Sequence, residues 1–271
     1  MRTPSLSGRV VAVTGGARGI GDAIARAAAA AGARVAIGDL DASLAATSAA
    51  SYGAIGVPLD VTSNESFAGF LDKVEAELGP VDALVNNAGI MVIGRMLETD
   101  LDKQLRQLDV NLRGVVLGCH VAAPRIAAGG GGQIVNIASL AGRIPIPGSA
   151  VYCATKAGVL ALSEALDAEL APSGVRVAAI LPAFTATRLI DGTIAPPMSR
   201  PITPELVAAR VVDVLAQHRG TSVVPRRLTF SSGTWAAMPW RAKPRMRRVF
   251  GLDDMFTEFD HEARADYDAA T

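Results

Sequence analysis

The sequence contains very few residues of the types that build disulfides or metal sites. Its two cysteines, Cys119 and Cys153, lie far apart and form no CxxC pair, so a disulfide framework is excluded. The three histidines, His120, His218 and His261, share no metal-ligand spacing, and we expect them to be structural or surface residues and the protein to hold no metal. Such sparse cysteine use fits a reducing compartment, and we expect a cytoplasmic protein.

Long apolar runs and an excess of charge of one sign are also absent. No uncharged apolar run reaches the roughly 18 residues of a membrane-spanning helix, and residues 1–5 form a short polar lead without the apolar core of a signal peptide. The formal net charge is zero, which argues against nucleic acid as a partner. Half of the 271 residues are hydrophobic, enough for a substantial core in one α/β domain.

Short apolar segments alternate with helical patterns along most of the chain. Strands are predicted at residues 10–13, 34–38, 54–59, 83–85, 134–137, 175–181 and 222–224, and helices at 64–78, 100–127, 150–171 and 204–218, besides an alanine-rich helix that ends near residue 31. Because parallel strands are joined by helical crossovers, this order predicts a single-domain α/β Rossmann fold. We expect a doubly wound parallel sheet of about seven strands with helices on both faces, in a catalytic domain over residues 1–224 and an extension over 225–271.

A glycine-rich turn follows the first predicted strand and precedes the alanine-rich helix. Residues 14–21 read TGGARGIG. Glycines let the backbone approach a pyrophosphate, and the start of a helix favours an anion through its free N–H groups and its dipole. The spacing is not GxGxxG, so the turn alone is also compatible with a tight turn that binds no ligand.

Asp39 ends the second predicted strand, about 20 positions after the glycine turn. A carboxylate there can accept hydrogen bonds from the adenosine ribose hydroxyls. It would repel a 2′-phosphate, so Asp39 predicts NAD(H) rather than NADP(H). Arg18 weakly favours NADP(H), because its guanidinium could meet a phosphate. Alternatively, Arg18 is a solvated loop cation.

Tyr152 and Lys156 are spaced i, i+4 on a predicted helix, so both side chains project from one face. An ammonium beside a phenol favours the phenolate and lowers the pKa of the tyrosine from about 10 towards the working range. Tyr152 is therefore a candidate general acid/base, and Ser139 supplies a hydroxyl that could hold a substrate oxygen. The alternative is a half-exposed helical pair without chemistry.

Several candidate residues follow the ends of predicted strands, where ligands bind in open parallel sheets. These are the glycine turn, Asp39, Asp60, Asn87, Ser139 and Pro182. Because these residues share one edge of the predicted sheet, we expect them to form a single site.

With these motifs in order, the chain resembles the short-chain dehydrogenase/reductase family, of the compact single-domain type, over about residues 7–224. The TGxxxGxG loop of the family matches residues 14–21, its NNAG motif matches residues 86–89, its catalytic asparagine falls at Asn111, its serine at Ser139, and its YxxxK pair at Tyr152 and Lys156. One departure follows the sixth strand. The family commonly has Pro-Gly there, whereas this chain has Pro182 and Ala183, which narrows the backbone freedom of the loop.

The resemblance implies a nicotinamide cofactor and hydride transfer between a carbonyl and a hydroxyl. Tyr152 would move the substrate proton, Ser139 would hydrogen-bond the reacting oxygen, and Lys156 would hold the nicotinamide ribose and lower the pKa of Tyr152. Asn111 would hold a water that links Lys156 to solvent. The expected cofactor-binding residues are Gly15, Arg18, Gly19, Ile20, Gly21, Asp39, Asp60, Val61, Asn87, Ala88, Gly89, Tyr152, Lys156, Pro182, Thr185 and Thr187, and the expected substrate-binding residues are Ser139 and Tyr152.

The residues expected on the substrate side are mostly apolar: Met91, Val92, Ile93, residues 144–147 and residues 189–198. They predict a lipophilic secondary alcohol or ketone, unless they only pack the lid or core. The leading hypothesis is an NAD(H)-dependent alcohol dehydrogenase or ketoreductase. The alternatives are an NADP(H)-dependent 3-ketoacyl-type reductase, which Asp39 disfavours, and a non-catalytic dinucleotide-binding regulator, which the complete catalytic set disfavours. The family further implies a homodimer or homotetramer.

The last part of the sequence has an uneven charge distribution. Residues 225–250 contain seven Arg or Lys, no acid, and both Trp235 and Trp240, whereas acids dominate from residue 251 onward. A basic segment with tryptophans can lie on an anionic membrane surface, which would suit a lipophilic substrate. The alternative is packing across an oligomer interface or pairing with the acidic end, because charge runs are usually solvated faces.

Overall fold

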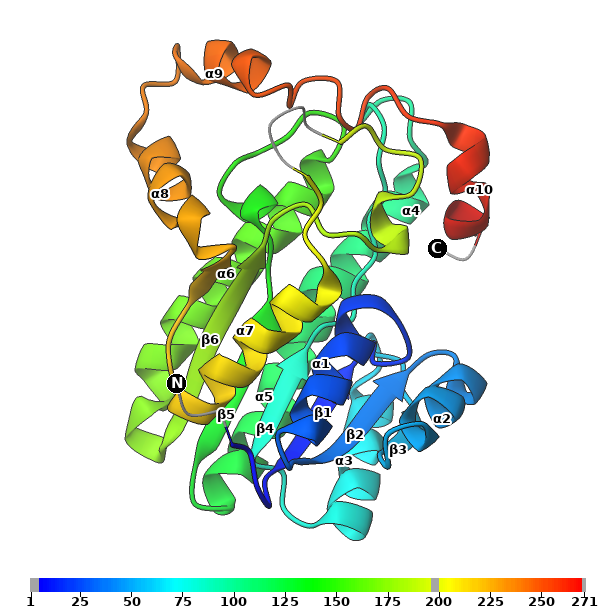
Figure 1. The fold of residues 1–271 in the computed structure, drawn as a ribbon, viewed down its shortest axis with the longest axis vertical. Helices are drawn as coiled ribbons and strands as arrows, with labels where there is room; N and C mark the ends of the chain where they lie inside the picture. Colours follow the sequence, from blue (N-terminus) through cyan, green and yellow to red (C-terminus); the bar gives the residue numbers. More distant parts are fainter. Residues whose placement is uncertain (1–4, 196–199, 270–271) are drawn as a thin grey trace.

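Seven parallel strands form one sheet in the order β3-β2-β1-β4-β5-β6-β7 (Figure 1). The computed structural model describes residues 5–195 and 200–269. The strands are β1 (Val10–Thr14), β2 (Arg34–Asp39), β3 (Ile55–Pro58), β4 (Ala83–Asn86), β5 (Gly132–Ile137), β6 (Val175–Pro182) and β7 (Ser222–Val224). The predicted doubly wound Rossmann fold is confirmed, with each predicted strand in place to within two residues.

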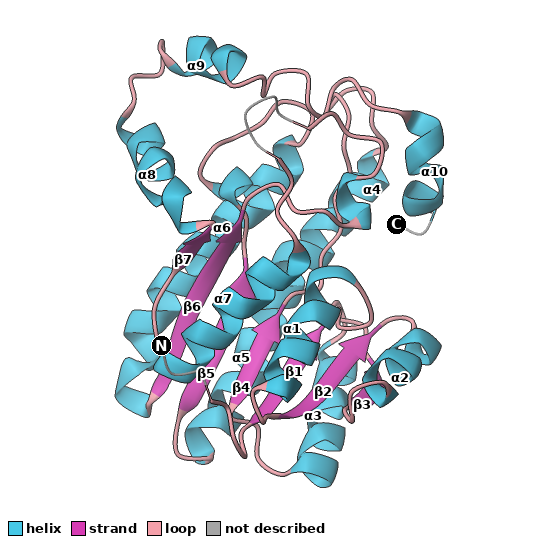
Figure 2. Ribbon diagram, in the orientation of Figure 1, coloured by secondary structure: helices cyan, strands magenta, loops and turns pink. Residues whose placement is uncertain are grey.

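Helices cover both faces of this sheet (Figure 2). The main ones are α1 (Gly19–Ala30), α2 (Ala42–Ala50), α3 (Asn64–Leu78), α4 (Leu101–Leu108), α5 (Gly114–Ala128), α6 (Ala150–Leu170) and α7 (Pro204–Gln217). None of the helices in the described part of the chain combines the length and hydropathy that a bilayer-spanning segment requires.

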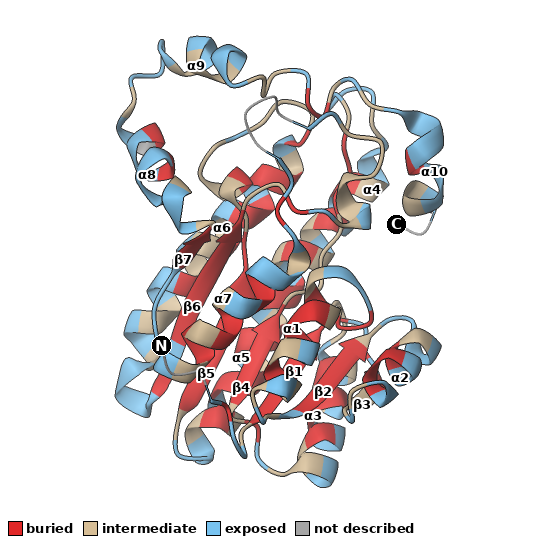
Figure 3. Ribbon diagram, in the orientation of Figure 1, coloured by how far each residue is buried: buried red, intermediate tan, exposed pale blue. Residues whose placement is uncertain are grey.

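The core consists of two apolar layers, one on each side of the sheet (Figure 3). Side chains alternate along a strand, so Val11 and Val13 of β1 face the layer of α1, α2 and α7. Val10 and Ala12 face the other layer, with α3, α5 and α6. Because both faces are buried, the strands are nearly continuous apolar runs.

Helix α3 shows how closely local signals fix an element. Its N-cap is Ser63, whose Oγ accepts a hydrogen bond from the Ser66 amide at 3.2 Å. The helix buries four apolar side chains, Phe67, Phe70, Leu71 and Val74. It ends at Gly79, whose φ of 88° a residue with a side chain rarely adopts.

Two features of the core differ from the sequence-based expectation. Helix α2 is present where no element was predicted. The helix predicted over residues 100–127 is divided by a π-helical turn, η1 (Asp109–Arg113), between α4 and α5. The π turn carries Asn111, whose side chain bonds to the backbone of Ile90 after β4 through two hydrogen bonds of 2.8 Å. Such turns are frequent at functional sites.

The C-terminal segment lies beyond the carboxyl edge of the sheet (Figure 1). It contains α8 (Thr229–Ala237), α9 (Lys243–Val249) and α10 (His261–Ala269). Helices α8 and α9 form an arch over this edge, and α10 lies beside α4, where Lys103 Nζ donates to the Asp268 carbonyl at 2.7 Å.

Candidate active site

A cavity of about 980 Å³ lies at the carboxyl ends of the strands. It extends from the glycine turn, past Asp39, to Ser139, Tyr152 and Lys156. Of the predicted site residues, all but Gly21 and Asn111 line it. The fold therefore brings together residues that lie far apart in the sequence.

The glycine turn presents backbone to this cavity. Gly15 and Gly19 have φ values of 61° and 59°, which the absence of a Cβ permits. Arg18 is the N-cap of α1 and makes no side-chain cap hydrogen bond, so its side chain does not satisfy the N–H groups of the first turn. Uncapped N–H groups at a helix start facing a cavity fit a pyrophosphate.

The neighbouring strand end fixes the shape of the turn. Asn87 Nδ2 donates to the carbonyls of Thr14 and Gly15 at 2.9 and 3.0 Å. Thr14 Oγ1 accepts from the amides of Asn87 and Ala88, both at 3.0 Å. Gly21 lies beneath the turn, where a Cβ would collide with the Gly15 carbonyl and Asn87 Nδ2. Gly21 therefore supports the glycine turn from beneath but does not line the cavity.

At the opposite end of the glycine turn, Asp39 closes β2. One of its carboxylate oxygens accepts from the Ala17 amide at 3.1 Å, and the other accepts from the Asp41 amide at 3.2 Å. Asp60 lies two residues after the end of β3, and its Oδ1 accepts from the amide and hydroxyl of Thr62 at 2.9 and 2.7 Å. Hydrogen bonds from Thr62 hold the pKa of Asp60 below its usual range.

The four predicted catalytic residues gather where β4, β5 and α6 meet. Lys156 is 5% exposed, and its Nζ donates to the Ile137 carbonyl at 2.8 Å and lies 5.7 Å from the centre of the Tyr152 ring. Ser139 Oγ accepts from the Ala141 amide at 3.1 Å. Gly89 lies close to both Asn111 and Lys156. A Cβ at this position would lie 3.2 Å from Asn111 Oδ1 and 3.6 Å from Lys156 Nζ.

Comparison with known proteins agrees with this geometry. Residues 9–195 match the model of the family described as short chain dehydrogenase. The chain belongs to the short-chain dehydrogenase family. The family implies oxidoreductase chemistry with a nicotinamide dinucleotide, NAD(H) or NADP(H), as the cofactor.

Relatives of this dehydrogenase carry several activities. The chain is 41% identical over 189 residues to D-threitol dehydrogenase of Mycolicibacterium smegmatis, covering 68% of this chain and 73% of the relative. It is 37% identical over 239 residues to cis-4-hydroxycyclohexanecarboxylate dehydrogenase of Sinomonas cyclohexanicum, covering 83% and 96%. It spans only 32% of the length of the probable oxidoreductase EphD of Mycobacterium tuberculosis, at 40% identity over 190 residues.

A solved structure agrees with the fold. The 3-ketoacyl-(acyl-carrier-protein) reductase of Brucella melitensis, determined in complex with NADH, superposes with a TM-score of 0.74 at 31% identity. The match covers 82% of this chain and 99% of that one.

Burial determines the protonation of the central pair in the dehydrogenase. Burial raises the pKa of Tyr152 above its usual value, and a hydrogen bond with Ser139 opposes this effect. Burial also lowers the pKa of Lys156 to about 8. The predicted lowering of the Tyr152 pKa is thus wrong for the protein without cofactor, because desolvation of the phenolate is the largest effect on it.

The loop after β6 tolerates its departure from the family pattern. Ala183 has no positive φ, and its amide donates to the Val224 carbonyl at 2.8 Å. Thr185 Oγ1 in turn donates to the Ala183 carbonyl at 2.7 Å. Alanine therefore occupies the turn without backbone strain, and Thr187 remains on the cavity wall beside Gly19.

The prediction that certain apolar residues line the substrate side of the cavity is confirmed only in part. Met91, together with Ile144, Ile146, Leu189 and Ile190, lines the cavity. Val92 and Ile93 do not line it; both side chains are buried, and Ile93 packs in the small apolar cluster around Tyr152. Pro145, Pro147 and residues 191–195 do not line it either, and residues 196–198 of the predicted segment lie outside the described residues.

The outer wall of the cavity comes from the C-terminal segment, which sequence reasoning missed. This wall includes Trp235, Met238, Met246, Phe250, Leu252, Met255, Phe256 and Tyr267. Trp235 is 5% exposed, so it packs towards the cavity and is not available to a membrane. The only signal in the sequence was the frequency of large apolar residues among the charges, and it did not indicate which way they face.

Proposed function

We propose that this dehydrogenase transfers hydride between NAD(H) and a lipophilic secondary alcohol or ketone, with Tyr152 as general acid/base. The observation that carries the proposal is the cavity itself. It joins Asp39 at one end to Tyr152 and an apolar wall at the other, so a dinucleotide and an apolar substrate can meet beside the phenol.

The bound nicotinamide supplies the hydride chemistry, and the chain supplies proton transfer and charge stabilisation. Ser139 Oγ accepts a hydrogen bond from the Ala141 amide, and its rotatable hydroxyl can still donate to a substrate oxygen. Tyr152, in contact with Ser139, gives its proton to that oxygen during reduction and takes it back during oxidation.

Lys156 and Asn111 complete the arrangement. An ammonium has three donors, and Lys156 uses one on the Ile137 carbonyl, which leaves donors for the ribose hydroxyls of the nicotinamide. Asn111 uses its side chain to hold the Ile90 backbone, and through it the Gly89 backbone next to Lys156. We infer that Asn111 acts here by fixing the cofactor side of the site.

Two other functions are less well supported. An NADP(H)-dependent 3-ketoacyl-type reductase would share the fold of the Brucella enzyme, but Asp39 would repel a 2′-phosphate. A non-catalytic dinucleotide-binding regulator would have no need for a buried Tyr152 and Lys156 pair, and keeping a buried ammonium is costly.

A substrate panel tests the proposal directly. Oxidation of cyclohexanol, 2-decalol, 2-octanol and D-threitol is followed by NADH or NADPH absorbance. We expect the apolar alcohols to be oxidised with NAD⁺ at a kcat/KM at least 10-fold above that for D-threitol. A preference for the polyol would overturn the lipophilic substrate, and a preference for NADP⁺ would overturn the assignment of the cofactor.

Exchanging Asp39 for asparagine should weaken the preference for NAD(H). Asp39→Asn keeps the acceptor for the Ala17 amide and removes the charge that faces a 2′-phosphate. We expect the ratio of kcat/KM for NADP⁺ to that for NAD⁺ to rise about 10- to 100-fold, or about 1.4–2.8 kcal/mol. Asp41→Asn, which removes a nearby charge outside the cavity and keeps an N-cap of α2, is the matched control and should leave the ratio unchanged.

A further inference from the structure

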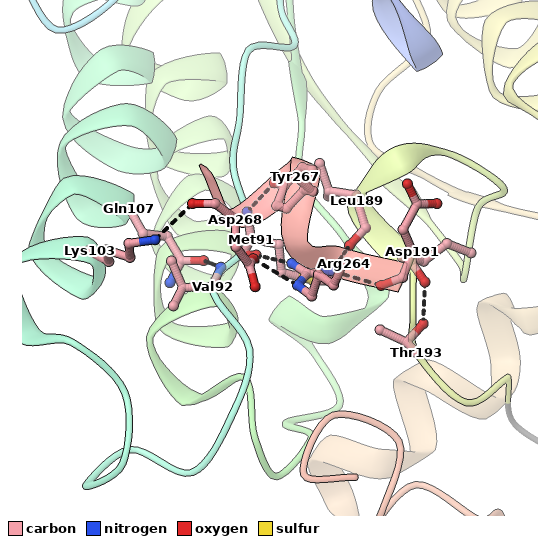
Figure 4. A network of polar contacts seen from close by, with 11 residues as sticks. Met91, Val92, Lys103, Gln107, Leu189, Asp191, Thr193, Arg264, Tyr267 and Asp268 are labelled. Carbon is pink, nitrogen blue, oxygen red and sulfur yellow. Dashed lines mark hydrogen bonds and ion pairs between the residues drawn. The ribbon is translucent and has the colours of Figure 1, made fainter. Parts of the chain in front are cut away.

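Arg264 on α10 is fully buried, although it is charged and lies only seven residues from the end of the chain (Figure 4). Its Nη1 donates to the carbonyls of Leu189 and Asp191 at 2.9 and 3.2 Å. Its Nη2 donates to the Met91 carbonyl, and its Nε pairs with Asp268 Oδ1 at 3.0 Å. One guanidinium thus joins α10 to the loop after β4 and the loop after β6.

Arginine is suited to this position by its geometry. Burying an unpaired charge is costly, so a fully buried guanidinium requires partners for most of its five N–H donors. The rigid fork of arginine can reach three carbonyls on two different loops, whereas the single ammonium of lysine cannot meet them in the same geometry. The bonded carbonyls belong to Met91 and Leu189, which line the cavity, and to Asp191 next to them.

Tyr267 lies one turn further along α10 and lines the same cavity. Its hydroxyl accepts from the Met91 amide at 2.8 Å. The Arg264 guanidinium carbon lies 4.5 Å from the centre of its ring, within the range of a cation–π contact. The ring is therefore held by a hydrogen bond at its tip and by the arginine at its face, close enough to Tyr152 to affect its pKa.

Other contacts fasten the same segment to the substrate loops. The Asp260 amide donates to the Gly192 carbonyl at 2.8 Å, and Thr193 forms a β-bridge with Phe259. A Cβ on Gly192 would collide with the Asp260 carbonyl, so the loop and the start of α10 fit closely. The loop after β6 is therefore fastened to the residues that lead into α10.

We propose that Tyr267 is a specificity-determining residue of the substrate pocket and that Arg264 is the positioning residue that holds it there. On this proposal, which rests on the proposed function, the chain supplies a wall of its own substrate site from its last helix. The Tyr267 ring limits the size of the group that can stand beside Tyr152, favouring a single ring over a fused one.

Tyr267→Ala tests the specificity role with cyclohexanol as the small probe and 2-decalol as the bulky one. We expect the ratio of kcat/KM for 2-decalol to that for cyclohexanol to rise at least 10-fold, mainly through KM, with NADH binding by fluorescence unchanged. Tyr267→Phe keeps the ring and should stay within 3-fold of the wild-type ratio. An unchanged ratio in Tyr267→Ala would overturn the specificity role.

We call the bonds from Arg264 to the loops after β4 and β6 the clamp. Hydrogen exchange tests the clamp without any substrate, so its outcome is separate from that of the proposed function. In Arg264→Lys we expect the amides of residues 261–269 and 189–193 to exchange at least 10-fold faster, with the substrate ratio shifted in the same direction as in Tyr267→Ala. Arg248→Lys, on the exposed end of α9, is the matched control. Unchanged exchange of both segments in Arg264→Lys would overturn the clamp. If wild-type protein oxidises neither alcohol, the proposed function fails and the exchange result still decides the clamp.

A second observation concerns α8 and α9, which form the outer rim of the cavity. These helices and the loop between them expose large apolar side chains: Phe230 on α8 is 83% exposed, Trp240 in the loop 72% and Val249 on α9 64%. Arg241 lies over the Trp240 ring at 5.3 Å. Among the described residues, Arg247 is the one cation of residues 225–250 that forms an ion pair, with Asp253 at 3.1 Å.

We infer that this rim docks on an anionic bilayer surface. Residues 225–250 contain seven cations and no acid, and among the described residues six of these cations form no ion pair, so they can complement anionic headgroups. Exposed aromatic rings suit the interface of a bilayer. The same segment carries Trp235, Met246 and Phe250 on the cavity wall. Docking would therefore place the apolar pocket next to lipophilic substrates that are dissolved in the bilayer.

Vesicle sedimentation tests this docking. Full-length protein should sediment with vesicles of equal parts phosphatidylcholine and phosphatidylserine and much less with pure phosphatidylcholine. The double variant Phe230→Ser with Trp240→Ser should lower the bound fraction at least 10-fold, whereas Lys73→Gln, on the distant α3, should not. Absence of binding to either vesicle would overturn the inference. If vesicle binding is absent and the double variant dissociates an oligomer in gel filtration, the rim is an oligomer interface and the inference is likewise overturned.

Discussion

Tyr152→Phe should lower kcat for alcohol oxidation by about 10²- to 10⁴-fold, the range that a positioned general acid/base contributes. The variant keeps the buried ring and its packing in the apolar cluster with Met91 and Phe256, so the fold should be unaffected. It removes the phenol hydroxyl that is in contact with Ser139, and with it the route for the substrate proton. Steady-state kinetics and NADH fluorescence titration together measure the loss of turnover at unchanged cofactor affinity.

Tyr52→Phe is the matched control for this experiment. Tyr52 packs against the apolar layer of α1, α2 and α7 and does not line the cavity. Loss of the Tyr52 hydroxyl should leave kcat within 2-fold of wild type. If Tyr152→Phe retained wild-type turnover, the phenol could not be the proton donor, and the mechanism proposed here would be wrong.

Local signals in the sequence were enough to predict most of the fold. The strand at Val10–Thr14 is a buried apolar run, the turn at residues 14–21 has glycines where φ must be positive, and α3 has both a serine cap and a glycine stop. Each of these signals arises from backbone chemistry within a few residues. Right-handed crossovers then leave few ways to assemble the strands into a sheet.

Where local signals are weak, prediction from the sequence was incomplete. Helix α2 is a run of alanines and serines without a clear apolar face, and tertiary packing of Ala45 and Ala49 against the sheet holds it. The π turn at Asn111 depends on the distant Ile90 backbone, which no pattern within the helix reveals. The docking of α10 depends in the same way on carbonyls more than 70 residues away.

The candidate site shows the same division. The motif residues were predicted from their spacing. The cavity wall that the C-terminal segment supplies was not predicted, because the apolar residues of 235–256 are interspersed with charged ones and show no pattern that indicates a buried face. The electrostatics were also misjudged. Spacing places an ammonium beside a phenol, whereas burial, which the sequence does not show, dominates the pKa values of both.

Lys156→Met should produce the second large loss, of about 10²-fold or more in kcat for oxidation, because the phenolate of Tyr152 loses the nearby cation that stabilises it. Alcohol oxidation requires Tyr152 without its proton, so the rate rises with pH on the acid side of the profile. We expect removal of this cation to move the limb to higher pH, because a positive charge 5.7 Å from the centre of the Tyr152 ring favours the phenolate over the phenol. A pH–rate profile of kcat/KM measures the shift, and an unmoved limb would show that Lys156 acts only on the ribose.

The same substitution has a signature in stability. The pKa of Lys156 is about 8 in the folded protein, below its value of about 10.4 in the unfolded chain, so the unfolded chain binds more protons between these two values. The wild-type protein therefore gains stability as pH rises from about 8 to about 10.4, by an amount on the order of 3 kcal/mol from this group, and Lys156→Met should lack that gain. Denaturant unfolding of both proteins at pH 8 and pH 10 measures the difference. Lys73→Met, at an exposed lysine paired with Glu77, should follow the wild-type dependence, and a variant at position 156 that did so too would mean that the ammonium is not buried as the structure shows.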